Sequence, residues 1–188
     1  MFCGQMRINI DIDRSIQTGR LRPVNLSWDN YSSIALYILL AAVFILVGLI
    51  LPTIFIISMI KQDNLNEIWL VFLFYVPGFL TLYGLVKDNR LTTFQGKDMG
   101  TNKRAMILLI KDKFETDLVY EGEKVIIYYK RPTFWTFGSR LVVCFNEDDI
   151  MINLSKFNQY GLKSFFHQLF LERTVNSIIK EFGNRVVS

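Results

Sequence analysis

Residues 34–60 read IALYILLAAVFILVGLILPTIFIISMI and contain no charged side chain. A helix needs about 20 apolar residues to cross a hydrocarbon core of roughly 30 Å, so this run is long enough to span a membrane with some tilt. Residues 68–86, IWLVFLFYVPGFLTLYGLV, form a second uncharged run after a short polar loop. A charge at mid-bilayer costs about 2.5–3.5 kcal/mol on insertion scales, and neither run carries one. The sequence therefore predicts an N-terminal transmembrane helical hairpin over residues 31–86.

Prolines and small residues interrupt both runs. Pro52 and the Pro77-Gly78 pair predict kinks, which membrane helices tolerate when neighbouring groups satisfy the freed carbonyls. Small residues could allow helices to pack closely, although none has GxxxG spacing, and homo-oligomerisation through the spans is a further expectation. These residues are Ala41, Ala42, Gly48, Gly78 and Gly84.

The rest of the 188-residue chain divides around the hairpin. Residues 87–188 are enough for one small domain, whereas residues 1–30 are too few to fold alone. We expect residues 1–30 to supply a cytosolic strand and a linker that pair with the domain formed by residues 87–188.

Basic residues flank the hairpin on both outer sides and are scarce in its loop. The loop KQDNLNE has Lys61 against Asp63 and Glu67. The flanking cations are Arg7, Arg14, Arg20 and Arg22 before the first run, and Lys87, Arg90, Lys97, Lys103 and Arg104 after the second. The first run begins too late and is too long for a secretory signal peptide. The positive-inside rule thus predicts a two-pass protein of the inner membrane with both termini in the cytoplasm.

Alternating and helical patterns predict an α+β domain. Residues 6–13, MRINIDID, alternate as a half-buried strand does, and a lone strand must pair, so we expect it to join the sheet of the soluble domain. Further strands are expected at residues 104–111, 117–120, 124–130, 140–146 and 150–154, with turns at Gly122 and at residues 147–149, and residues 87–103 as a polar connection. From residue 162 the apolar spacing is helical, with Ser164 as N-cap, a break near Leu171 and a stop at Gly183. A small antiparallel sheet closed by a C-terminal amphipathic helix is the predicted architecture.

No pattern typical of an enzyme is present. The single histidine, His167, has no carboxylate or nucleophile at a useful spacing. Cys3 and Cys144 form neither a disulfide framework nor a metal motif. We therefore expect no catalysis, no cofactor and no metal.

The best candidate binding segment is residues 128–140, YYKRPTFWTFGSR, where cations and large rings are crowded together. The candidate residues are Lys130, Arg131, Phe134, Trp135 and Arg140. Such a mixture suits an anionic small ligand, an anionic membrane surface or a protein partner, or else the rings cover one end of a small core. The formal net charge of +4 is too mild to favour nucleic acid.

The order of segments also carries a resemblance. MRINIDID before the spans, KVIIYYK and RLVVCFNEDDIMINL as strands, and LKSFFHQLFLERTVNSIIKEF as closing helix resemble small bacterial two-span membrane proteins with a pleckstrin-homology-like cytosolic domain, the YcxB type. The resemblance implies a non-enzymatic membrane-anchored module that senses a ligand or binds a partner. The layout is also similar to two-span β-domain effectors of antiphage defence, which implies a cyclic-nucleotide ligand and spans that oligomerise to disrupt the membrane. It is similar as well to small hairpin immunity or assembly proteins, which implies a protein partner.

Overall fold

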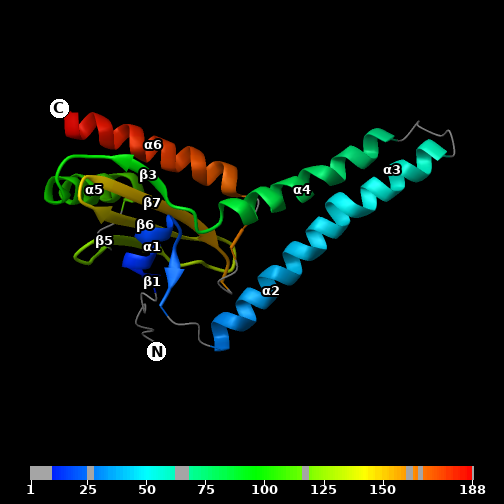
Figure 1. The fold of residues 1–188 in the computed structure, drawn as a ribbon, viewed down its shortest axis with the longest axis horizontal. Helices are drawn as coiled ribbons and strands as arrows, with labels where there is room; N and C mark the ends of the chain where they lie inside the picture. The colour runs from blue at the N-terminus through cyan, green and yellow to red at the C-terminus, as the bar shows by residue number, and fades with distance from the viewer. Residues whose placement is uncertain are drawn as a thin grey trace.

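A sheet domain and a projecting arm of apolar helices make up the computed structural model (Figure 1). The structure describes residues 10–24, 28–61, 68–115, 119–159, 163–164 and 167–187. The elements are β1 (Ile10–Asp11), α1 (Ile12–Thr18), β2 (Arg22–Pro23), α2 (Trp28–Ile45), η1 (Leu46–Ile50), α3 (Leu51–Lys61), α4 (Ile68–Lys87), β3 (Thr92–Gln95), α5 (Met99–Phe114), β4 (Val119–Glu121), β5 (Val125–Lys130), β6 (Gly138–Asn146), β7 (Asp149–Phe157) and α6 (Gln168–Val187).

The apolar arm consists of two paired helical segments. The elements α2, η1 and α3 follow one another without a break, and α4 packs back against them (Figure 1). By length and composition, Ala35–Lys61 is the described helix that could cross a membrane, while the apolar stretch Val71–Lys87 is shorter. The structure is thus compatible with one span, and the second span stays a prediction.

A π-helical turn and two glycines shape the arm. Proline has no N–H, and its ring clashes with the carbonyl four residues earlier, so Pro52 disturbs the turn before it. The backbone there widens into η1, where the N–H of Leu51 donates to the carbonyl of Leu46. A Cβ at Gly48 or at Gly78 would lie 2.7 Å from backbone of the other glycine. Glycine at both positions therefore lets the two helices touch, which confirms the expected close packing.

The sheet has five antiparallel strands in the order β3-β7-β6-β5-β4. Strands β5, β6 and β7 confirm the strands expected at 124–130, 140–146 and 150–154, and the turn between β6 and β7 contains Glu147 at φ 53°. Strand β3 lies in the stretch expected to be a polar connection. It is polar because it is an edge strand with Thr92 and Thr93 exposed, and it pairs with β7 through its backbone.

Helix α5 replaces the strand expected at residues 104–111. Asp98 caps the helix by accepting from the N–H of Thr101 at 3.0 Å. Met106, Leu109 and Ile110 recur at helical spacing and are fully buried against the sheet. A short apolar run fits a strand or a helix equally well by its local pattern. The expected strand is wrong because the Asp98 cap and the packing against the sheet favour a helix.

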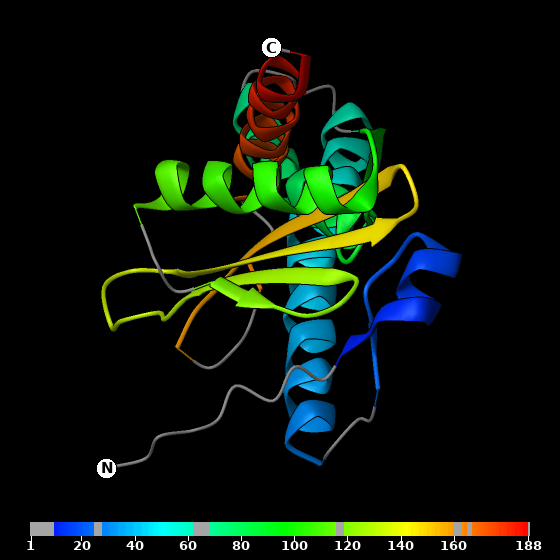
Figure 2. The same ribbon diagram turned by 90° about the vertical axis from the view of Figure 1, so that its left-hand side faces the viewer.

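Helix α6 covers the same face of the sheet as α5, and the N-terminal elements lie away from both (Figure 2). The buried stripe of α6, made by Leu171, Val175, Ile178 and Phe182, is continuous. Since α6 runs unbroken from Gln168 to Val187, the predicted break near Leu171 and the predicted stop at Gly183 are wrong. The helix also begins later than expected, because Lys163 forms a β-bridge with Phe157 and α6 starts at Gln168; the expected start at residue 162 and the expected N-cap at Ser164 are therefore wrong. The side chain of Ser164 contacts Nδ1 of His167 at 2.6 Å.

The N-terminal unit packs on the opposite face of the sheet. Of the expected strand at 6–13, residues 6–9 lie outside the described part, β1 pairs with β2 rather than with the main sheet, and Ile12 already belongs to α1. The strand prediction was wrong there because Asp11 caps a helix, and Ile12 and Ile16 recur at helical spacing. The unit still joins the domain, since the N–H of Leu21 donates to Asn89 (2.8 Å) and Ile10, Ile12 and Ile16 pack on the cluster around Val142 and Cys144.

Candidate functional site: the cleft where the apolar arm joins the sheet domain

The predicted binding segment is divided by the structure. Lys130, Arg131, Phe134 and Trp135 lie together and exposed at the connection between β5 and β6. The two rings are 74% and 87% exposed, so they do not cover the core. Arg140 lies apart from them, because its strand position places it on the sheet face that carries Val142 and Cys144, where its Nε is buried.

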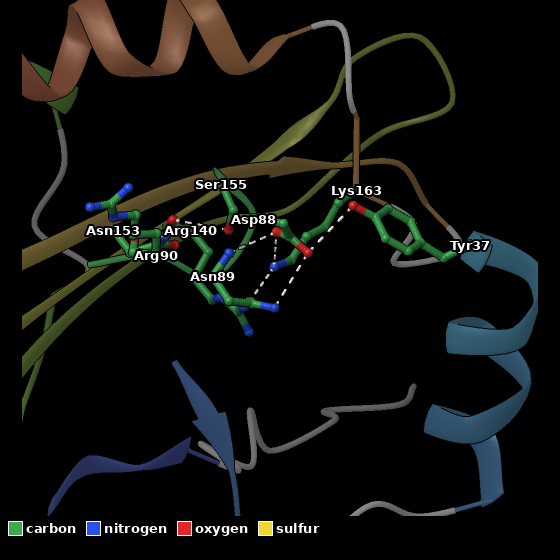
Figure 3. A network of polar contacts seen from close by, with 8 residues as sticks. All are labelled: Tyr37, Asp88, Asn89, Arg90, Arg140, Asn153, Ser155 and Lys163. Atoms are coloured by element: carbon green, nitrogen blue, oxygen red, sulfur yellow. Dashed lines mark hydrogen bonds and ion pairs between the residues drawn. The ribbon is translucent and has the colours of Figure 1, made fainter. Parts of the chain in front are cut away.

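Arg140 belongs instead to a polar cluster around Asp88, the residue that follows α4 (Figure 3). We call Tyr37, Asp88, Asn89, Arg140 and Lys163 the Asp88 cluster. The Lys163 Nζ donates to Asp88 Oδ1 and to Asn89 Oδ1, both at 2.5 Å. The Tyr37 hydroxyl donates to Asp88 Oδ2 at 3.4 Å. Three separate segments therefore meet at one carboxylate: the first apolar helix, the end of α4 and the connection between β7 and α6.

Burial governs the charges in this cluster. It lowers the pKa of Lys163, while the Asp88 carboxylate opposes that shift and Arg140 adds to it. Burial also lowers the pKa of Arg140, again opposed by Asp88. Asp88 is thus the counter-ion for two cations, and removing it would leave both without their main compensation.

Two buried polar atoms, one in the Asp88 cluster and one beside it, lack a hydrogen-bond partner among the described residues. They are Nε of Arg140 and Oδ1 of Asn153. Asn153 is only 6% exposed, and its Nδ2 donates to the carbonyl of Arg90 at 2.8 Å. Buried polar groups are usually satisfied, so an unpartnered acceptor next to a cleft marks a place where a ligand or water supplies a donor.

Asn153 lines a cleft of about 470 Å³, which we call the junction cleft. It lies between the segment after α4, strands β3 and β7, and the start of α6. Its lining combines buried apolar residues with polar ones, among them two cations and one carboxylate. The lining residues are Lys87, Arg90, Leu91, Thr92, Thr93, Ile152, Asn153, Leu154, Gln168, Leu171, Glu172, Val175 and Asn176.

A second set of contacts closes the arm-side end of the junction cleft. Lys87 and Glu172 form an ion pair at 3.0 Å, and the Tyr83 hydroxyl donates to Glu172. Lys87 Nζ also lies 5.6 Å from the centre of the Tyr83 ring. Burial opposes ionisation of Glu172, but the hydrogen bonds from Tyr83 and Lys87 hold its pKa below the usual value. The cleft therefore shares side chains with the contact between α4 and α6.

Sequence reasoning selected Arg140 but missed Asp88, Asn153, Lys163 and Glu172. Asp88 and Lys163 are 75 positions apart, and no local pattern signals their contact. The one sequence feature that could have pointed to Asp88 is the charged pair Lys87-Asp88 directly after an apolar run. Charges at that place mark the end of a span, where the arm meets the soluble domain. Within the described part of the chain, no group of three His, Cys, Asp or Glu side chains is placed to hold a metal ion.

Comparison of the chain with protein-family models, with curated proteins and with solved structures found no match.

Proposed function

We propose that this chain is a two-span inner-membrane protein whose cytosolic sheet domain binds a small anionic ligand in the junction cleft. The observation that carries the ligand proposal is the unpartnered, buried Oδ1 of Asn153 in a cleft that also presents Lys87 and Arg90. The role is sensing or interaction, not catalysis.

Membrane insertion is supported by the surface of the arm. Leucine, isoleucine, valine and phenylalanine side chains are exposed along both helical segments, among them Ile38, Leu39, Leu73 and Phe79. A soluble protein rarely exposes so large an apolar area. Two threonine hydroxyls in the arm are satisfied internally, because Thr53 donates to the carbonyl of Leu49 and Thr81 to that of Pro77. The basic flanks orient both termini toward the cytoplasm.

The chemistry of the cleft selects the ligand class. Lys87 and Arg90 suit a phosphate or carboxylate group, and Arg90 is exposed enough to reach one. The Asn153 oxygen accepts only, so a ligand that pairs with it directly carries an N–H or O–H donor. Leu91, Leu154 and Leu171 offer apolar contacts to a ring or short chain. A phosphorylated small molecule that carries a polar donor and a ring or short apolar chain has all three features.

The position of the cleft supports coupling to the arm. A ligand anion that contacts Lys87 competes with Glu172, because both need the same ammonium group. Occupation of the cleft would therefore change how α4 is held against α6. This is the structural basis on which we propose sensing.

The test is binding of adenosine monophosphate, inorganic pyrophosphate and glycerol 3-phosphate to the purified full chain in lipid nanodiscs, measured by calorimetry. We expect at least one probe to bind, and Arg90→Ala to weaken it about tenfold, at the low end for a charge-assisted hydrogen bond because Arg90 is exposed. Asn153→Ala should weaken binding of adenosine monophosphate and glycerol 3-phosphate, which carry amino or hydroxyl donors, more than binding of pyrophosphate.

The matched control is Arg104→Ala, which removes the same charge from an exposed position on α5, outside the residues that line the junction cleft. It should leave binding unchanged. Absence of binding by every probe, or equal weakening by Arg90→Ala and Arg104→Ala, would refute the ligand proposal.

A further inference from the structure

The connection between β5 and β6 exposes two large rings that nothing in the described structure covers. Phe134 and Trp135 pack edge to face with ring centres 4.8 Å apart, and they are the most exposed large apolar side chains described. Exposed apolar clusters of this kind mark interaction surfaces, because leaving them in water is unfavourable. Lys130 and Arg131 precede the rings, and neither makes an ion pair with a described residue.

The connection holds the rings out rather than letting them fold back. The N–H of Thr133 donates to the carbonyl of Thr136 at 2.9 Å, and the N–H of Thr136 donates to Oγ1 of Thr133 at 3.1 Å. Gly138 closes the base, since a Cβ there would lie 2.7 Å from the Lys130 carbonyl and from the Phe157 ring. Residues 131–137, which we call the tip, therefore form an ordered turn in the absence of a partner.

This tip lies at the end of the domain from which the arm departs. Gly138 pairs with Phe157, the last residue of β7, and the Phe137 ring lies 4.7 Å from that of His167, just before α6. The start of α6 is adjacent to the end of α4 (Figure 1). Leu169 and Phe170, in the first turn of α6, are also exposed. Exposed rings and the arm thus share one end of the domain.

We propose that the tip inserts Phe134 and Trp135 into the headgroup region of the same leaflet that the arm enters, with Lys130 and Arg131 at anionic lipid headgroups. Tryptophan favours this interface because its ring is apolar while its indole N–H remains hydrogen-bonded. Basic residues near the surface are attracted by anionic lipid. The proposal rests on the membrane insertion proposed above and adds a third contact, which would hold the domain against the bilayer.

The test uses the fluorescence of Trp135 in the full chain with Trp28→Phe and Trp69→Phe, reconstituted in vesicles of phosphatidylcholine and phosphatidylglycerol. We expect phosphatidylcholine brominated near the headgroup end of its acyl chains to quench most of the emission. Lys130→Glu with Arg131→Glu should reduce that quenching. The control is Leu108→Trp with Trp135→Phe in the same background, since Leu108 is exposed on α5, away from the arm (Figure 1). Its emission should stay unquenched.

Equal quenching of the two tryptophans, or no quenching of Trp135, would overturn the proposal. Shielding of Trp135 from aqueous acrylamide without quenching by brominated lipid would also overturn it, because a protein surface would then cover the tip. Alkaline carbonate extraction separates this failure from that of membrane insertion. A chain that stays in the membrane with an unquenched Trp135 refutes only the tip, whereas a chain released by carbonate refutes the spans.

Discussion

The ion pair between Asp88 and Lys163 should be a strong electrostatic contact in the joint between arm and domain. Removing one partner of a fully buried pair costs about 3–5 kcal/mol, because the other charge is left uncompensated. The two side chains are 19% and 21% exposed. We therefore expect Lys163→Met or Asp88→Asn alone to lower the free energy of unfolding by roughly 2–3 kcal/mol.

The double variant distinguishes pairing from packing. With both charges gone, Arg140 still lacks its counter-ion but Lys163 no longer adds an uncompensated charge, so the loss should be smaller than the sum of the two single losses. Thermal unfolding of the full chain in mild detergent, followed by circular dichroism, measures this. Each single change should lower Tm by roughly 5–10 °C for a chain of this size. The control is Lys124→Ala, whose partner Asp13 is 75% exposed, and whose loss should stay below about 0.5 kcal/mol. Additive losses, or single losses no larger than that of Lys124→Ala, would refute the reasoning.

Three further predictions follow from burial and close approach. The pKa of Glu172 is held below 4.5, so its ionised form stabilises the fold above that pH. The free energy of unfolding, measured as a function of acid pH, should fall as the pH drops through the lowered pKa. This fall should be smaller in Glu172→Gln, which has no carboxylate to protonate. Burial raises the pKa of Cys144 to about 11, so mass spectrometry should find no alkylation there at neutral pH until the chain is unfolded. Gly48→Ala should separate the two helical segments, seen as a longer spin-label distance, whereas Ala42→Val on an exposed face should not.

Local patterns predicted the parts of the fold whose residues carry their own signal. Strands β5, β6 and β7 each contain a short, mainly apolar run, VIIYY, LVVCF and IMINL, and the acidic turn between β6 and β7 lies where expected. Helix α5 was missed because RAMILLIK suits a strand or a helix until the Asp98 cap is considered. Strand β3 was missed because an edge strand needs only backbone partners, which leave no apolar alternation.

The candidate site was much less predictable than the fold. Arg140 was chosen for its neighbours in sequence, yet strand alternation turns it toward Asp88 and away from Trp135. Lys163 and Glu172 reach the end of α4 only through the path of the chain after β7. Such contacts depend on tertiary structure, because no residue in either segment signals a partner on the other.

The central claim, that the chain crosses the membrane twice, is tested most directly by reporter fusions in a bacterial host. Alkaline phosphatase is active only outside the cytoplasm. Green fluorescent protein fluoresces only inside it, because the protein does not become fluorescent when it is exported in unfolded form. The account predicts active phosphatase at Asn64, within the loop between the two apolar runs, and fluorescence at both termini. Inactive phosphatase at Asn64, or active phosphatase at either terminus, would contradict it.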